Sequence, residues 1–177
     1  MSKPGWFSRL SGRKPEGEGA APAESAAAEG EGAPSAEPAP TDAAGWKKKG
    51  LALAGRKRYE EALACYDRGL EIDPRDSGLW FDKGVALGSL RRYQEELACY
   101  DRGLEIDPRN WLLWANRGAA LCVIGHLQEA LACFDRGLEI DPRNWLLWNN
   151  KGATLKALGR TREAKECSRR AKELGGR

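Results

Sequence analysis

The chain has 177 residues, of which 41% are hydrophobic and 31% charged, and these proportions are those of a soluble globular domain. It contains no run of about 18 apolar residues, so the sequence predicts no transmembrane segment. The net charge of +3 divides into −3 over residues 1–42, where four Lys or Arg face seven Asp or Glu, and +6 over residues 43–177. A positive balance this small, without a clustered basic stripe, argues against nucleic acid as a partner.

The first 42 residues lack the pattern of a folded domain. Residues 15–44 are almost entirely Ala, Glu, Gly, Pro and Ser, and such a segment buries too little apolar surface to offset its ordering entropy. We expect a disordered tail over residues 1–42. Its beginning combines apolar and basic side chains, namely Trp6, Phe7, Leu10, Lys3, Arg9, Arg13 and Lys14. This segment is either an unstructured terminus or a weak docking segment for a partner groove or an anionic membrane surface.

A secretory signal would require an apolar core of about 7 to 15 residues, and none follows the first aromatic residues. We therefore expect a cytoplasmic location.

One unit recurs through the rest of the chain. The stretch Cys65–Arg75 returns almost unchanged at Cys99–Arg109 and at Cys133–Arg143, a spacing of 34 residues. The same spacing relates four tryptophans and four glycines: Trp46, Trp80, Trp114, Trp148, Gly50, Gly84, Gly118 and Gly152. A fixed period of this length is typical of a repeat array. We place the repeats at 43–76, 77–110, 111–144 and 145–177.

Each repeat contains two helical patterns. In the second repeat, Trp80, Gly84 and Leu87 fall on one stripe of a first helix, and Tyr93, Leu97, Tyr100 and Leu104 form that of a second. Residues 88–92 are the expected connection, where the third and fourth repeats place Gly125 and Gly159 as helix C-terminal glycines. The sequence therefore predicts an all-α fold, a right-handed superhelical solenoid of about four helix-turn-helix repeats.

The repeated Asp-Pro dipeptide defines the junctions. Proline disfavours helix at the residue before it, so the second helices should end near Asp73, Asp107 and Asp141. The next first helices should then be capped by Asp76, Asn110 and Asn144, each contributing about 1 kcal/mol.

With these residues in place, the chain resembles the tetratricopeptide repeat family over residues 43–177. The family pattern is met in the first repeat by Trp46, Gly50, Leu53, Ala62, Tyr66, Gly69 and Pro74. Two departures stand out. Glu96 replaces the small residue of the second repeat, so we expect Glu96→Ala to raise the melting temperature. Ser168 replaces the aromatic residue of the fourth repeat, whose polar last helix is typical of a terminal cap.

The resemblance implies a concave groove, lined by the first helices, that binds a peptide of a partner protein. The implied groove residues are Lys47, Lys48, Leu51, Phe81, Asp82, Val85, Leu112, Ala115, Asn116, Ala119, Val123, Leu146, Asn149, Asn150, Ala153 and Lys156. The Asn side chains are either peptide-backbone partners or solvated surface residues. Some family members bind a chaperone tail through Lys and Asn. Lys47 matches that pattern, but Leu51 stands in place of the Asn, which argues against this ligand.

Catalysis, a metal site and a cofactor are not expected. The chain has one His, His126, and four of its five cysteines occupy equivalent positions about 10 Å apart in successive repeats. A disulfide requires Cα atoms within about 7 Å. We therefore predict a protein-protein interaction scaffold or adaptor. The alternative is a self-associating repeat protein, assembled through the end faces or through Trp6 and Phe7.

Overall fold

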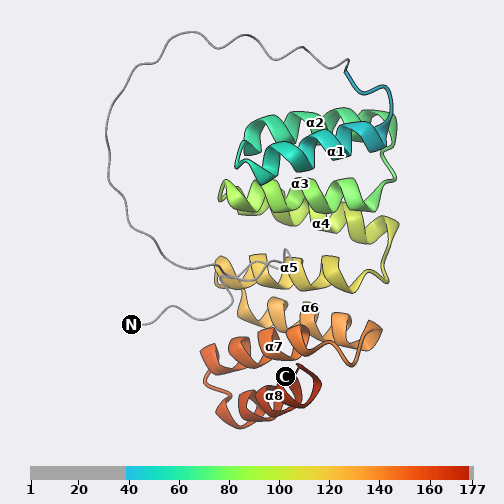
Figure 1. The fold of residues 1–177 in the computed structure, drawn as a ribbon. Coiled ribbons are helices and arrows are strands. Elements are labelled where there is room, and N and C mark those ends of the chain that lie inside the picture. The colour runs from blue at the N-terminus through green and yellow to red at the C-terminus, as the bar shows by residue number, and fades with distance from the viewer. Residues whose placement is uncertain (1–38, 176–177) are drawn as a thin grey trace, which may run out of the picture.

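The computed structural model describes residues 39–175, which form an all-α solenoid (Figure 1). The predicted tail and its docking segment lie mostly in residues 1–38, outside the described residues. Within 39–175 there are eight helices and no strand: α1 (Ala43–Gly55), α2 (Tyr59–Ile72), α3 (Ser77–Ser89), α4 (Tyr93–Ile106), α5 (Trp111–Val123), α6 (Leu127–Ile140), α7 (Trp145–Ala157) and α8 (Thr161–Gly175).

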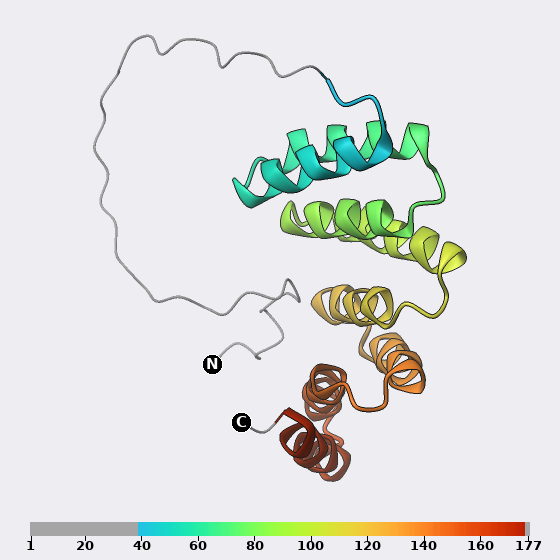
Figure 2. The ribbon, with the colours of Figure 1, turned by 45° about the vertical axis from the view of Figure 1, so that its right-hand side comes forward.

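The helices pack as four hairpins, α1 with α2, α3 with α4, α5 with α6 and α7 with α8, and each hairpin stacks on the next. In the view of Figure 2, α1 to α4 lie side-on whereas α5 to α8 are seen closer to end-on, so the stack twists along its length. The predicted all-α repeat solenoid is confirmed.

In each of the first three hairpins, an aromatic side chain of the second helix packs on a glycine of the first helix. Tyr66, Tyr100 and Phe134 are each 1% exposed and lie against glycines of the first helix in their repeat. A Cβ at Gly50 or Gly84 would be less than 3.0 Å from ring carbons of the facing tyrosine. The repeated glycine is therefore required for close helix packing rather than for a special backbone conformation.

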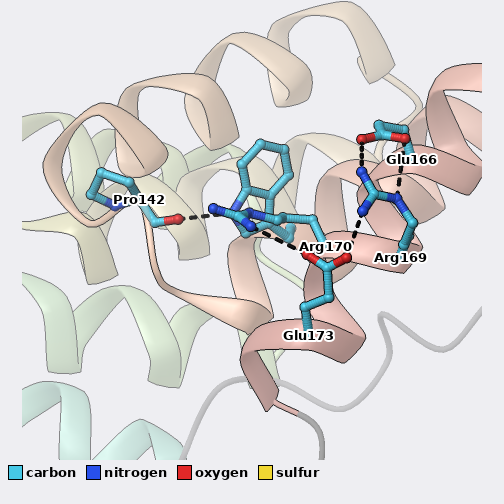
Figure 3. A network of polar contacts seen from close by, with 6 residues as sticks. Pro142, Glu166, Arg169, Arg170 and Glu173 are labelled. Atoms are coloured by element: carbon cyan, nitrogen blue, oxygen red, sulfur yellow. Dashed lines mark hydrogen bonds and ion pairs between the residues drawn. The ribbon is translucent and has the colours of Figure 1, made fainter.

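The junctions between repeats are built alike. Tryptophan Nε1 donates to the carbonyl oxygen of the preceding proline at 3.0, 3.0 and 2.9 Å in the pairs Trp80–Pro74, Trp114–Pro108 and Trp148–Pro142 (the last in Figure 3). The predicted caps are confirmed, because the side-chain oxygens of Asp76, Asn110 and Asn144 accept hydrogen bonds from backbone N–H groups of the next helix. The second helices end at Ile72, Ile106 and Ile140, as the Asp-Pro dipeptides indicate.

The turns inside the repeats require a left-handed residue. Gly125 and Gly159 have φ of 88° and 77°, as expected for C-terminal glycines, whereas Lys57 and Arg91 adopt φ of 62° at the equivalent positions. One prediction was wrong here. The connection of the second repeat was placed at residues 88–92, but α3 continues through Ser89 because the left-handed residue comes only at position 91.

The last helix lacks the aromatic contact. In the fourth repeat the neighbours of a Cβ at Gly152 would be Cys167, Ala164 and Ser168 at 3.2 to 3.4 Å. The solvent side of α8 carries ion pairs one helical turn apart. Arg169 bonds to Glu166 and Glu173, and Arg170 Nη1 lies 3.2 Å from Glu173 Oε2 (Figure 3). Such exposed pairs each contribute well under about 1 kcal/mol, and they are consistent with a helix whose outer face meets solvent.

Candidate functional site

The predicted groove residues differ widely in exposure. Lys48, Leu51, Asn149 and Lys156 are exposed, and most of the others are half-buried. Three are buried: Ala115 is 0%, Asn116 6% and Asn150 7% exposed. Asn116 Nδ2 donates to the Leu112 carbonyl oxygen at 2.9 Å, so this amide is already engaged within its own helix. Ala115 presents no surface to a ligand, and we leave it out of the binding surface proposed below.

The basic residue at the start of the predicted groove is paired. Lys47 Nζ lies 3.3 Å from Asp76 Oδ1 and 3.9 Å from Asp82 Oδ2, which joins the first and second repeats. Burial, with a smaller contribution from the nearby Asp76 carboxyl group, raises the pKa of Asp82 to about 6 against the opposing attraction of Lys47. The positive charge expected from Lys47 is therefore largely compensated by two carboxyl groups.

A cavity of about 330 Å³ lies where α3, α4 and α5 meet. Three predicted residues of α5 line it, Asn116, Ala119 and Val123. The rest of its lining is Tyr59, Gly88, Ser89, Arg91, Tyr93, Glu96 and Ala120. The structure thus brings the middle of the predicted groove together with residues from the turn of the second repeat, which the family pattern did not include.

Glu96 is a buried charged residue that lines this cavity. Its side chain is buried, with 4% of its surface exposed, and the Tyr100 hydroxyl donates to its Oε1 at 3.1 Å. The carboxyl group occupies the space above Gly88, where any Cβ would be less than 3.0 Å from the carboxyl carbon and both oxygens. The sequence identified Glu96 as a departure, but its place in a cavity depends on Gly88, a residue that gave no signal of its own.

A second cavity, of about 590 Å³, lies between α7 and α8. It contains the predicted residues Asn149, Ala153 and Lys156. Its further lining combines three basic side chains with small or hydroxyl-bearing residues, namely Lys165, Arg169, Lys172, Ser168, Thr161, Gly152 and Ala164. Ser168 stands where the earlier repeats place Tyr or Phe. The space that a ring would fill is open, and its walls are positively charged.

The remaining predicted residues are not gathered in either cavity. Phe81 packs at the edge of the core, with its ring centroid 6.2 Å from that of Tyr100, and Val85, Leu112 and Leu146 are half-buried on their helices. Two tryptophans open α5 and α7. Trp111 packs against the core, whereas Trp145 is 50% exposed and lies against Gly175 at the end of α8.

Reactive groups do not cluster in the part of the chain that the structure describes. The five cysteines are free and buried, and burial raises the pKa of each thiol. A raised thiol pKa disfavours the nucleophilic thiolate. Over residues 39–175 no group of three or more His, Cys, Asp or Glu side chains could hold a metal ion. None of the described helices has the length and apolar character needed to cross a membrane.

These features define a helical-hairpin repeat protein with two cavities, one walled by the buried carboxyl group of Glu96 and the other lined by several basic side chains. Residues 43–76 match the family model of the tetratricopeptide repeat, and residues 85–161 match that of the CABIN1 N-terminal domain. Residues 43–76 are thus a tetratricopeptide repeat, and the described residues have the fold of a tetratricopeptide-type helical solenoid. A search of curated proteins by sequence gives no match.

Solved structures of other proteins share this fold. The first repeat domain of Spaghetti (RPAP3), bound to the HSP90 peptide SRMEEVD, is 25% identical with a TM-score of 0.65, over 67% of this chain and 94% of that one. MamA from Desulfovibrio magneticus RS-1 is 19% identical with a TM-score of 0.70, over 76% of each chain. A further MamA structure is 14% identical with a TM-score of 0.72, over 75% and 78%.

Proposed function

We propose that this protein is a non-catalytic adaptor that binds a peptide segment of a partner protein along the face formed by α1, α3, α5 and α7. The observation that carries the proposal is the position of the two cavities. Each contains three of the residues that the family pattern implies for a groove: Asn116, Ala119 and Val123 in one, and Asn149, Ala153 and Lys156 in the other. A related repeat domain with a bound peptide supports the same use of the fold.

The charges favour a particular class of peptide. The cavity at α3–α5 has an acidic wall, whereas the cavity at α7–α8 has a basic one. A peptide with a basic side chain at one end and an acidic group at the other would match both, and like charges would be disfavoured. A chaperone tail gripped by a free lysine at the first repeat is not favoured, because Lys47 is already paired with Asp76 and Asp82.

The proposal also covers location and chemistry. We propose a cytoplasmic protein, which the five free thiols of the described residues support, since such thiols persist in reducing compartments. We propose no catalytic role, which is consistent with cysteines whose burial raises their thiol pKa.

The test compares two variants of the full chain as baits in lysate of the source cells. Ala119→Glu/Ala153→Glu places two carboxylates in the half-buried cavity linings. Ala98→Glu/Ala132→Glu places the same groups on exposed positions of α4 and α6 and is the matched control. We expect the wild type and the control to capture the same partner and the cavity variant to lose it, with circular dichroism showing all three folded.

Capture of the same proteins by both variants would reject the ligand face. Light scattering on the wild type then addresses the alternative of self-association, which predicts a mass above that of one chain.

A further inference from the structure

The cavity at α3–α5 owes its form to two replacements in the same repeat. Glu96 stands where the other repeats have Ala62, Ala130 and Ala164. Gly88 stands where they have Ala54, Cys122 and Lys156. Because a Cβ at position 88 would overlap the Glu96 carboxyl group, the glycine makes room for the acid, and the second repeat differs from the others by a matched pair.

The chemistry of this pair points to a cation. Glu96 is buried at the wall of the cavity, where the Tyr100 hydroxyl holds Oε1 in place. Tyr59 and Tyr93 also line the cavity, and both are half-buried. A carboxylate bonds a guanidinium or ammonium group more strongly than a neutral donor, and tyrosine rings add cation–π attraction. Arg91 lines the cavity as well, but it is exposed, so solvent and salt screen its charge.

We propose that this cavity binds an arginine or lysine side chain of the chain's own first 14 residues. That segment carries four basic side chains, at positions 3, 9, 13 and 14, next to Trp6 and Phe7. It offers the cation that the Glu96 wall attracts, together with aromatic rings for the apolar surface of Ala119 and Val123.

The length of the connecting chain fits this contact. Residues 15–42 separate this segment from α1, and 28 residues with the dimensions expected of a flexible coil would have an r.m.s. span of about 26 to 32 Å. The cavity lies two hairpins from the start of α1, about 20 Å across the stack at roughly 10 Å per packed helix pair. It also lies toward the opposite end of the first helices, about 20 Å along their axes at 1.5 Å per residue. The resulting distance of about 28 Å equals the span, where the effective concentration of a tethered segment is highest.

Occupation of the cavity would cover Asn116, Ala119 and Val123, so the segment would compete with a partner peptide. The regulatory role of this contact rests on the proposed function. The contact between the N-terminal segment and the cavity does not. The following experiment contains no partner. Its failure would leave the proposed function standing, and failure of the capture test would leave the contact standing.

The experiment places the photocrosslinker p-benzoylphenylalanine at Phe7 in the full chain, at low micromolar concentration. After irradiation, crosslinked tryptic peptides are mapped by mass spectrometry. We expect intramolecular crosslinks to the region of Gly88 to Glu96 and to that of Asn116 to Val123. Glu96→Gln, which keeps the side-chain size, should lower their yield about tenfold, as expected for loss of a charge-assisted bond. Glu95→Gln, on an exposed carboxylate paired with Arg92, should keep the yield within about twofold.

A second pair of variants leaves the helices untouched. Lys3→Gln/Arg9→Gln/Arg13→Gln/Lys14→Gln, which removes all four basic side chains, should reduce the crosslinks as Glu96→Gln does, and Glu16→Gln/Glu18→Gln should not. This pair decides the question if circular dichroism shows Glu96→Gln to be unfolded. Crosslinks at other helices, crosslinks between two copies, or equal yields from Glu96→Gln and Glu95→Gln would each overturn the proposal.

Discussion

The close contact between Gly88 and Glu96 allows a quantitative prediction of how substitutions at these positions change the free energy of unfolding. Gly88 lies within α3, so alanine there should gain about 1 kcal/mol of helix propensity. In the wild type this gain is outweighed, because the new Cβ would be less than 3.0 Å from the Glu96 carboxyl group and would displace it from the Tyr100 hydroxyl. Displacing a packed and hydrogen-bonded group costs about 2 to 3 kcal/mol. We therefore expect Gly88→Ala alone to destabilise the protein by about 1 to 2 kcal/mol.

The same substitution should act in the opposite direction once the acid is gone. Glu96→Ala removes a buried carboxyl group and should raise the melting temperature, as expected from the sequence. In that background Gly88→Ala meets only the methyl group of an alanine, as Ala54 and Ala62 do in the first repeat. The double variant should therefore be more stable than either single variant, with a coupling energy of about 2 kcal/mol.

The assay is thermal and urea unfolding of the four proteins followed by circular dichroism. At this chain length about 1 kcal/mol corresponds to a shift of roughly 2 to 4 °C. Gly55→Ala is the control, because nothing lies within 4 Å of a Cβ at that position, and its effect should be the same in the wild type and in the Glu96→Ala background. Additivity of Gly88→Ala and Glu96→Ala within about 0.5 kcal/mol would refute the steric pairing.

Three further predictions concern other repeats and the pH dependence. Burial raises the pKa of Asp82 from 3.8 to about 6, so the folded protein binds this proton more tightly than the unfolded chain, and stability should rise as the pH falls from 7 to 5. Asp82→Asn should remove that rise in melting curves at the two pH values, and an unchanged slope would contradict the assignment. Lys57→Gly should stabilise by about 1 kcal/mol by relieving a left-handed lysine, and Gly159→Ala should destabilise by a similar amount, both measured by urea unfolding. Trp114→Phe replaces the indole with a smaller ring that cannot donate to the Pro108 carbonyl, so its urea midpoint should fall by the equivalent of at least about 1 kcal/mol.

The features that the sequence predicted correctly are those fixed by local chemistry. A cap such as Asn110 needs only its own side chain and the N–H groups two or three residues ahead, and Asp107-Pro108 ends a helix through backbone sterics alone. The cap residue and the Asp-Pro dipeptide both recur every 34 residues, so a prediction that was correct at one junction was correct at the others. The error in the turn of the second repeat arose because Arg91 adopts the left-handed conformation without the glycine that marks it in the third and fourth repeats.

The candidate site was harder to predict from the sequence, because the exposure and pairing of its side chains are decided only when the hairpins stack. Position in the family pattern placed Asn116 and Ala115 on the ligand face, but packing buries both. The family pattern placed Lys47 in the groove, and its pairing with Asp76 and Asp82 arises only when the second repeat lies against the first. Neither the burial of Asn116 nor the pairing of Lys47 is indicated by the 34-residue pattern from which the sequence predictions were made.

Repetition itself explains where the specific chemistry of this protein lies. Residues that build the hairpins, such as Gly84 and Tyr100, recur because each repeat must pack in the same way. A recurring residue cannot distinguish one part of the face from another, so selectivity must come from positions where the repeats differ. The acidic cavity follows from the Gly88 and Glu96 pair, and the basic one opens where Ser168 replaces a ring. The departures from the repeat therefore give the face a direction, acidic toward the middle and basic toward α8, which a bound peptide would have to match.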